Sequence, residues 1–357
     1  MKLNSKEFKK ICITALSAVD ASELDSLELK TVGNILFLNV TNRRYFLSAK
    51  FCLQEAEPLH VVINASKFLK LIAAITADEI SLVAHESYLS VKANGNYKIA
   101  YAEGITELPM IDLGTTTVDM TIPGDTLDSI LTYNSREFLK PSKSPMQKLY
   151  YLDQEGCITR TTSVCVNNFK LEKPFTVLLD NKLVKLFKLF KGVDVAFKLG
   201  YTELNNTTQT TVSFETPTIT LTAITPSDDT LLTNFQASLC RNLANKLQPH
   251  TVVVKTSILA EALNRLYIFA SNQFFADITA TIDELTITSE NNTEIVMTST
   301  GSNVTADSYK MTINIETLKN IVDSCTEQYI TLSFGDHRGV VITRGAIQNV
   351  IPEALRS

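Results

Sequence analysis

Apolar residues recur at helical spacing in three stretches, each of which opens about a third of the chain. Residues 5–19 place apolar side chains on one face, at Phe8, Ile11, Cys12, Ala15, Leu16 and Val19. Residues 125–139 do the same with Leu127, Ile130, Leu131 and Phe138, and residues 257–270 with Leu259, Leu263, Leu266 and Phe269. Spacing of i, i+3 and i+4 predicts an amphipathic helix in each stretch. The first stretch also has weak signal-peptide character, but Glu7 interrupts its basic region, which favours the helix.

A second pattern, a strand followed by a helix, also occurs three times. It covers residues 62–72 (VINASKFLKLI), 177–187 (VLLDNKLVKLF) and 311–321 (MTINIETLKNI). Each copy passes from an apolar run through a residue expected to cap a helix, namely Ala65 or Ser66, Asp180, and Asn314. The three copies align without gaps, which predicts the same register for Lys70, Lys185 and Lys319.

Alternating strand patterns follow each copy, so the order helix, strands, helix, strands occurs three times. We therefore predict an α+β fold of three repeated domains, each with two helices packed on β-sheet. The expected domains are residues 1–117, 118–247 and 248–357.

The composition is that of a globular protein, with 45% hydrophobic and 20% charged residues and a net charge of −5. No apolar run approaches the roughly 20 residues that a membrane-spanning helix needs. The six cysteines include no CxxC pair, so we expect reduced, mostly buried thiols and a cytoplasmic location.

Lysines mark one side of residues 181–191 (NKLVKLFKLFK). On a helix the apolar residues would cover one half of the surface, and Lys182, Lys185, Lys188 and Lys191 the other, with no acidic residue among them. Exposed helices usually mix charge signs, so we interpret this side as a face for a polyanion, with a solubilising surface as the alternative. Further residues expected on the same DNA-facing lining are Lys6, Lys9, Lys10, Lys67, Lys70, Arg136, Lys140, Lys143 and Lys319.

Motifs for catalysis are missing from the sequence. It contains no glycine-rich phosphate loop, no HExxH and no GxSxG. The four histidines, His60, His85, His250 and His337, are scattered, and we interpret them as surface or capped residues without metal-ligand spacing. We predict a non-catalytic protein with no cofactor and no metal, although an enzyme site assembled from distant residues stays an alternative.

Four segments carry a resemblance to a known family: Val62–Ile72, Thr176–Leu186, Ile268–Phe274 and the terminal Gln348–Pro352. Through them and through its repeated plan, the chain resembles the bacterial DNA polymerase III beta subunit, the sliding clamp, as a divergent member of the kind that a phage or plasmid encodes. The resemblance implies a head-to-tail homodimeric ring around double-stranded DNA. It also implies a clamp loader and a DNA polymerase as partners, with the polymerase tethered without catalysis.

The resemblance also implies two interaction sites. A partner-peptide pocket would include Thr162, Ser163, Leu239, Leu243, Val350, Ile351 and Pro352. Residues 163–166 (SVCV) replace the family's acid-glycine-histidine-arginine run, so the peptide preference is expected to differ. The dimer interface would place Tyr97 and Ile99 of one chain against Ile268 and Phe269 of the other.

Two further alternatives stand beside this one. A structural or interaction protein of repeated α+β domains without DNA binding would explain the threonine-rich strands but not the lysines. A trimeric clamp like proliferating cell nuclear antigen would carry two such domains per chain, whereas three repeats favour a dimer.

Overall fold

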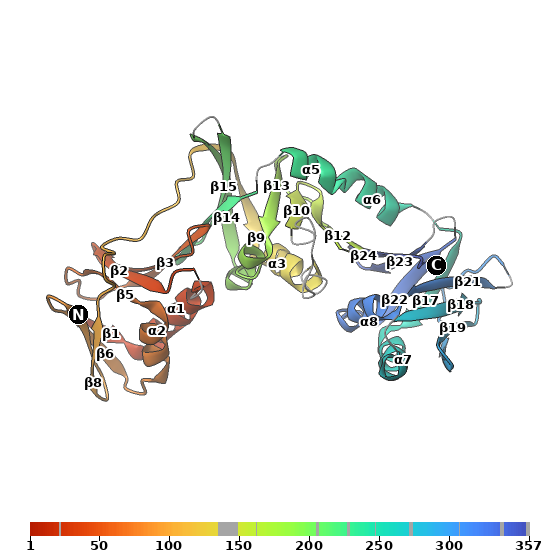
Figure 1. Cartoon of the computed structure of the whole chain (residues 1–357), viewed down its shortest axis with the longest axis horizontal. Coiled ribbons are helices and arrows are strands. Elements are labelled where there is room, and N and C mark those ends of the chain that lie inside the picture. The colour runs from red at the N-terminus through yellow and green to blue at the C-terminus, as the bar shows by residue number, and fades with distance from the viewer. Residues whose placement is uncertain are drawn as a thin grey trace. The chain divides into compact units, whose positions relative to one another are not determined.

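The computed structural model describes residues 1–20, 23–134, 149–161, 163–204, 207–226, 229–246, 248–270, 274–306, 308–335 and 339–354. Contacts divide the chain into two compact units, which are drawn in Figure 1. Unit 1 comprises Met1–Leu127 and Lys185–Ser227, and unit 2 comprises Asp128–Val184 and Asp228–Ser357. The middle third of the chain therefore contributes to both units.

Unit 1 contains one four-stranded and one eight-stranded sheet, in which all strand pairs are antiparallel. The smaller sheet has the order β1 (Lys2–Asn4), β6 (Glu79–Ala84), β7 (Tyr88–Lys92), β8 (Asn96–Ala100). The larger has the order β5 (His60–Asn64), β2 (Ser26–Val32), β3 (Ile35–Thr41), β4 (Tyr45–Cys52), β16 (Ile219–Thr225), β15 (Thr207–Glu215), β14 (Asp194–Leu204), β9 (Thr115–Pro123). Pairing of β4 with β16, with Leu47 opposite Leu221, joins four strands of the first third to four of the middle third.

Unit 2 repeats this arrangement. Its eight-stranded sheet has the order β13 (Thr176–Asp180), β10 (Leu149–Asp153), β11 (Gly156–Arg160), β12 (Val164–Asn168), β24 (Ile347–Pro352), β23 (Gly339–Arg344), β22 (Tyr329–Phe334), β17 (His250–Lys255). Its four-stranded sheet has the order β20 (Asn292–Met297), β19 (Glu284–Ser289), β18 (Phe275–Ala280), β21 (Tyr309–Asn314). Here β12 pairs with β24, with Val164 opposite Val350. Each third of the chain thus supplies two groups of four strands, which agrees with the predicted threefold repeat.

Two α-helices contact each other in both the first and the last third. They are α1 (Ser5–Ala18) with α2 (Ala65–Ala74), and α7 (Thr256–Phe269) with α8 (Ile315–Asp323). Their bounds confirm the helices predicted from residues 5–19 and 257–270 and from the repeated segments. The buried rings of Phe8 and Phe68 meet edge to face at 6.3 Å between α1 and α2. Along the described ranges, no helix is long and apolar enough to cross a membrane.

The middle third departs from the predicted pair of helices. Its opening helix is α3 (Gly124–Ser129), which continues as a π-helix, η1 (Ile130–Asn134), and the rest of the predicted stretch lies outside the described residues. The predicted helix 181–191 is a short α4 (Asn181–Val184) followed by a 3₁₀-helix, η4 (Phe187–Phe190). Two more helices, α5 (Asp229–Phe235) and α6 (Ala237–Asn245), follow β16.

Helix caps correct the register of the repeat by one residue. The side chains of Asn64, Asp180 and Asn314 accept hydrogen bonds from the backbone N–H groups of Lys67, Leu183 and Thr317, three positions further on. The cap of the first copy is therefore Asn64, not Ala65 or Ser66. Counted from the caps, Lys185 and Lys319 are equivalent to each other but Lys70 is one residue further along, so the predicted common register of all three lysines is wrong.

One of the two predicted domain boundaries lies inside a strand, and the other lies between two elements. Strand β9 begins at Thr115 and pairs with β14 along its length, so the boundary expected after residue 117 lies inside a continuous strand. The boundary expected after residue 247 lies between α6 and β17. The cysteines agree with expectation, because all six are free thiols and four of them are buried.

Candidate nucleic-acid interface

Residues 181–191 keep the predicted division into a basic and an apolar side. The four lysines of this segment are exposed, whereas Leu183, Val184, Leu186, Phe187 and Phe190 are buried. The burial pattern is thus confirmed although the helix is not continuous. A 3₁₀-helix has three residues per turn, so side chains three positions apart align along it. Phe187 and Phe190, which are three positions apart in η4, are accordingly both buried, and Lys188 lies between them on the exposed side.

Packing of two phenylalanines fixes residues 185–191 within unit 1. The rings of Phe187 and Phe190 lie 5.1 Å and 6.0 Å from the ring of Phe214 on β15. Gly124 approaches so closely that a Cβ atom there would lie 1.7 Å from the carbonyl oxygen of Phe190. Gly124 also donates its N–H to the carbonyl of Val193 at 2.8 Å. These contacts bury the apolar side and leave Lys185 and Lys188 in solvent.

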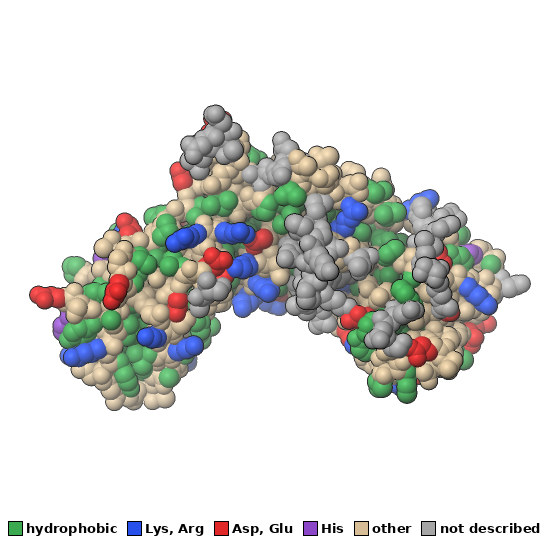
Figure 2. Space-filling model, in the orientation of Figure 1, with side chains coloured by type: hydrophobic (Ala, Val, Ile, Leu, Met, Phe, Trp, Pro, Cys, Tyr) green, Lys and Arg blue, Asp and Glu red, His purple; other side chains and the backbone are tan. Residues whose placement is uncertain are grey.

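Helices α1 and α2 add four exposed lysines to unit 1, namely Lys6, Lys10, Lys67 and Lys70. Among the described residues, none of these four forms an ion pair, and neither do Lys185 and Lys188. Figure 2 shows Lys and Arg side chains, in blue, gathered over the part of unit 1 that contains β14. Lys9 differs, because its Nζ donates to the carbonyl of Ile75 at the end of α2. Its charge is held at a helix C-terminus, where a cation is favourable.

Basic residues on the helices of the last third are paired with acids. Lys319 binds Asp323 at 2.7 Å, one turn further along α8, and lies 5.6 Å from the centre of the Tyr267 ring. Arg265 on α7 binds Glu294 on β20 at 2.7 Å. The charge of Lys319 is therefore largely neutralised in place, whereas the described residues offer no acidic partner to the exposed lysines at positions 6, 10, 67, 70, 185 and 188. Arg136, Lys140, Lys143 and Thr162 lie outside the described residues.

The residues predicted for a peptide pocket divide between the two faces of β24. Helix α6 contacts β12 and β24 within unit 2, and Val350 packs on the cluster that contains Ala237, Cys240 and Ala244. Leu239 is 49% exposed on α6, Leu243 is partly buried, and Pro352 is exposed. Ile351 points to the other face of the strand, where it is buried in the core of the last third. Ser163 is also buried, so these two side chains do not share a surface with Leu239.

Charged contacts hold α6 in place. The guanidinium of Arg241 donates to both carboxylate oxygens of Asp153, at 2.6 Å and 2.8 Å. Desolvation of Arg241 opposes its charge, but the hydrogen bond and charge of Asp153 raise its pKa above the ordinary value. Arg160 donates to the carbonyl of Phe235 and to Gln236, between α5 and α6.

The two four-stranded sheets each leave one edge strand beside exposed apolar residues. Strand β8 is an edge of the four-stranded sheet in unit 1 and carries Tyr97, which is exposed, and Ile99, which is buried. Strand β20 is an edge in unit 2 and contacts α7. The predicted residues Ile268 and Phe269 on α7 are 76% and 56% exposed, and on β20 Ile295 and Met297 are 56% and 62% exposed. The sequence analysis missed these last two residues, although their alternation with buried Val296 was a readable signal.

Solved structures resemble the whole chain. The DNA polymerase III subunit beta from Pseudomonas aeruginosa matches with a TM-score of 0.83 and 15% identity over 100% of both chains. The chain has the sliding-clamp fold. DNA polymerase III subunit beta from Borrelia burgdorferi, in complex with a natural product, gives a TM-score of 0.81 at 13% identity over 100% of this chain and 99% of that one.

The beta chain from Streptococcus pneumoniae also shares the sliding-clamp fold, with a TM-score of 0.80 and 12% identity over 99% of both chains. The sequence matches no protein-family model and no curated protein. At these identities most residues differ between this chain and the structures that share its fold. The resemblance to the beta sliding clamp in the sequence analysis is confirmed at the level of fold.

Proposed function

We propose that the chain is a DNA sliding clamp, which encircles double-stranded DNA as a homodimer and tethers a DNA polymerase without catalysis. The observation that carries this proposal is the full-length match to sliding clamps at a TM-score of 0.83. Three further features of the described residues support it: the six exposed lysines of unit 1 without an acidic partner there (Lys6, Lys10, Lys67, Lys70, Lys185 and Lys188), the edge strands β8 and β20, and the exposed apolar side chains near α6.

Lysines on helices are suited to a sliding contact with DNA. An ammonium group binds phosphates as a point charge and does not read bases, so the contact is independent of sequence. Lys6, Lys10, Lys67, Lys70, Lys185 and Lys188 are exposed, and the described residues offer them no acidic partner. With a net charge of −5 for the whole chain, these lysines give unit 1 a local surface that attracts DNA.

Closure of a ring would use the two edge strands. Both eight-stranded sheets consist of two groups of four strands that pair edge to edge, through β4 with β16 and β12 with β24. Pairing of β8 from one chain with β20 from a second chain would make a third sheet of this kind. The interface joins unlike surfaces, so two copies close a ring by forming it twice. It would also cover Ile268, Phe269 and Met297, which solvent contacts in the single chain.

Partner proteins would bind beside α6 and β24. Leu239, Leu243, Val350 and Pro352 offer apolar side chains there, whereas Ile351 and Ser163 are buried. A polymerase and a clamp loader that present apolar peptides are the proposed partners. Because residues 163–166 differ from the family's run at this place in the sequence, the chain would prefer peptides of its own replication system.

Charge reversal tests the DNA contact. Lys185→Glu with Lys188→Glu is compared with Lys92→Glu and Lys310→Glu, which reverse two exposed lysines on strands. Binding to a short DNA duplex is measured by fluorescence anisotropy over a range of salt concentrations. The first pair is expected to weaken binding and to lower the salt dependence, by about 0.9 in logarithmic slope for each lost phosphate contact. Equal effects of both pairs would contradict the proposed lining.

Substitution at the edge strand tests the dimer. Met297→Asp places a charge beside Ile295 on the edge strand β20, whereas Met110→Asp alters a residue that is even more exposed, at 73%, in the loop before β9. Sedimentation equilibrium is expected to give a dimer for the wild type and for Met110→Asp, and a monomer for Met297→Asp. A wild-type monomer at all concentrations would contradict the ring.

A further inference from the structure

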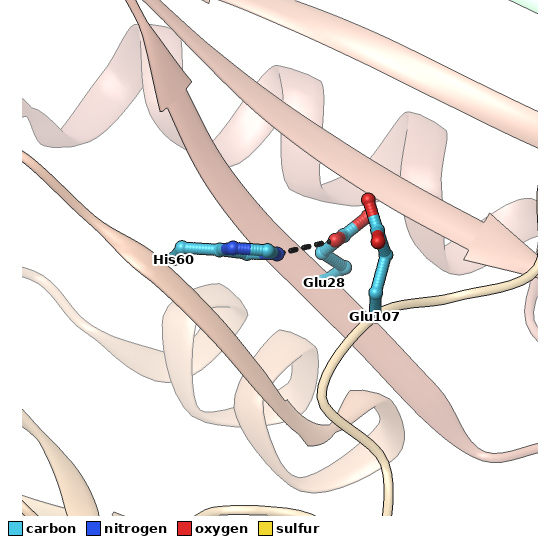
Figure 3. Close-up of side chains that lie close together, drawn as sticks. All are labelled: Glu28, His60 and Glu107. Atoms are coloured by element: carbon cyan, nitrogen blue, oxygen red, sulfur yellow. Dashed lines mark hydrogen bonds and ion pairs between the residues drawn. The ribbon is translucent and has the colours of Figure 1, made fainter.

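Three side chains with metal-binding atoms converge on one face of the eight-stranded sheet of unit 1. Glu28 lies on β2, His60 on the neighbouring β5, and Glu107 on the loop that joins β8 to β9. Figure 3 shows the three side chains pointing toward one another. One nitrogen or oxygen atom from each lies within 4.8 Å of the others. The residues are distant in sequence, so no spacing motif marks them, and the expectation that His60 is an ordinary surface or capped histidine missed the group.

The central carboxylate of this group is buried and held in a fixed orientation. The side chain of Glu28 is 2% exposed, and its Oε1 lies 2.7 Å from His60 Nε2. Asn39, opposite Glu28 on β3, donates its Nδ2 to the other carboxylate oxygen at 2.8 Å. Metal-binding carboxylates are usually oriented by such a hydrogen bond from a neighbouring group.

Asn39 provides a second, independent observation. It is only 7% exposed, and its Oδ1 atom accepts no hydrogen bond from the residues that the structure describes. A buried amide oxygen without a donor carries a free-energy cost. When a cation is bound at Glu28, rotation of the amide would make Oδ1 a further oxygen ligand, and the Nδ2 hydrogen bond to Glu28 would be given up in exchange.

Two carboxylates at this distance need a positive charge between or beside them. Lys30, two residues from Glu28 on the same face of β2, supplies one, with its Nζ 3.0 Å from Glu107 Oε1. A divalent cation would neutralise both carboxylates, whereas the ammonium contacts Glu107.

We propose that Glu28, His60 and Glu107 form a binding site for a divalent cation of the zinc class. One imidazole nitrogen and two carboxylate oxygens are ligands that zinc accepts, whereas magnesium and calcium prefer oxygen alone. Atoms bound to tetrahedral zinc at ~2.1 Å lie roughly 3.4 Å apart. Glu28 and His60 already approach more closely than this. The exposed Glu107 side chain closes the site by a change of rotamer.

The cation would fasten the loop between β8 and β9 to the sheet. Leu108, next to Glu107, is buried against Phe46 and Val62 on this sheet, so the loop already lies over the site. A bond from Glu107 to the metal would add a cross-link to β2 and β5 at the same place. This loop connects the first third of the chain to the middle third. The inference concerns this loop alone and does not depend on the proposed clamp function.

Zinc binding to the full-length protein tests the proposal. The background carries Cys52→Ser, because Cys52 is an exposed thiol and thiolates are zinc ligands. The protein is first stripped of metal with a chelator. It then competes with a colorimetric zinc indicator for added zinc chloride. Magnesium and calcium chloride serve as comparison ions. We expect one zinc ion per chain and no competition by magnesium or calcium.

Exposed residues carry the substitutions, because Glu28→Gln changes a buried side chain and risks misfolding. His60→Ala and Glu107→Gln are each expected to weaken zinc binding by about tenfold or more. The matched controls His85→Ala and Glu103→Gln alter an exposed histidine and an exposed glutamate nearby, and are expected to bind zinc as the parent does.

Lys30→Met distinguishes a metal site from an ordinary ion pair. It removes the ammonium that competes with the cation, so zinc affinity is expected to rise. Absence of stoichiometric zinc binding in the parent would overturn the proposal. So would equal binding by His60→Ala, Glu107→Gln and their controls, because zinc would then lie elsewhere.

Discussion

Arg241 on α6 and Asp153 at the end of β10 form two parallel hydrogen bonds, Nη1 to Oδ2 at 2.8 Å and Nη2 to Oδ1 at 2.6 Å. Both side chains are largely buried, at 15% and 13% exposed. A bidentate guanidinium–carboxylate pair restricts orientation as well as distance. The pair therefore sets how α6 lies on the sheet, and with it where Leu239 and Leu243 are presented.

Removal of this pair is expected to loosen α6. Arg241→Met keeps much of the aliphatic stem but leaves Asp153 without its bidentate partner, at an expected cost of about 2 kcal/mol in the free energy of unfolding. Lys2→Met breaks the exposed pair with Glu79 and is expected to cost less than about 1 kcal/mol. Urea unfolding measures both values. Equal destabilisation would show that Arg241 does not fix the helix.

The helix caps predict an unequal effect of one substitution at two equivalent sites. Asn314→Ala removes a single cap hydrogen bond, which Asn314 Oδ1 accepts from the backbone N–H of Thr317, and is expected to cost about 1 kcal/mol. Asn64→Ala also removes a hydrogen bond from Asn64 Nδ2 to Asp25 Oδ2 at 2.9 Å, so its cost is expected to be larger. Thermal unfolding of the two variants measures which substitution lowers stability more. Asn314→Ser is the control, because serine can also cap the helix. A larger loss at Asn314 would contradict it.

The thiols are expected to react in two groups. Cys52 is exposed, whereas burial raises the pKa of Cys12 and of Cys157 and so disfavours the reactive thiolate. At pH 8 a thiol reagent such as DTNB is expected to label Cys52 in the folded protein, and Cys12 and Cys157 after unfolding. As a control, Cys52→Ser is expected to lose the rapid reaction with DTNB that the folded wild-type protein shows. Fast labelling of Cys157 in the folded chain would contradict its placement in the core.

The ion pair between Arg265 and Glu294 on β20 is expected to shift the titration of the Glu294 carboxylate. The hydrogen bond from Arg265 lowers the pKa of Glu294 below its ordinary 4.5, against a smaller opposing effect of desolvation. The pair therefore stabilises the folded state above pH 4.5, and this contribution is lost as the pH falls through the lowered pKa. An NMR titration of the Glu294 carboxyl carbon is expected to have its midpoint below 4.5 in the wild type, and nearer 4.5 in Arg265→Met. Identical midpoints would show that the pair does not form in solution.

Much of the fold was predictable because burial follows local periodicity. Phe8 and Cys12, and Leu259 and Leu263, are buried where the helical spacing places them. In residues 181–191 the spacing gave the correct buried side but the wrong helix. Packing of Phe187 and Phe190 on Phe214, and the close approach of Gly124, override helical propensity there.

Sites assembled from distant residues were less predictable. The alternation of a strand decides that Val350 and Ile351 face opposite sides, but the sequence does not tell which of the two sides is the core. Lys319 and Asp323 stand four residues apart, so their ion pair was readable from spacing and was missed. Glu28, His60 and Glu107 meet only through sheet pairing and the course of one loop, which no local pattern reveals.

Small-angle X-ray scattering of the purified protein at several concentrations tests the central claim, that two chains form a ring. The account predicts a particle of twice the chain mass of 39.6 kDa, with the distance distribution of a hollow disc. A particle that stays monomeric, or a dimer that is compact or elongated without a central hole, would contradict it.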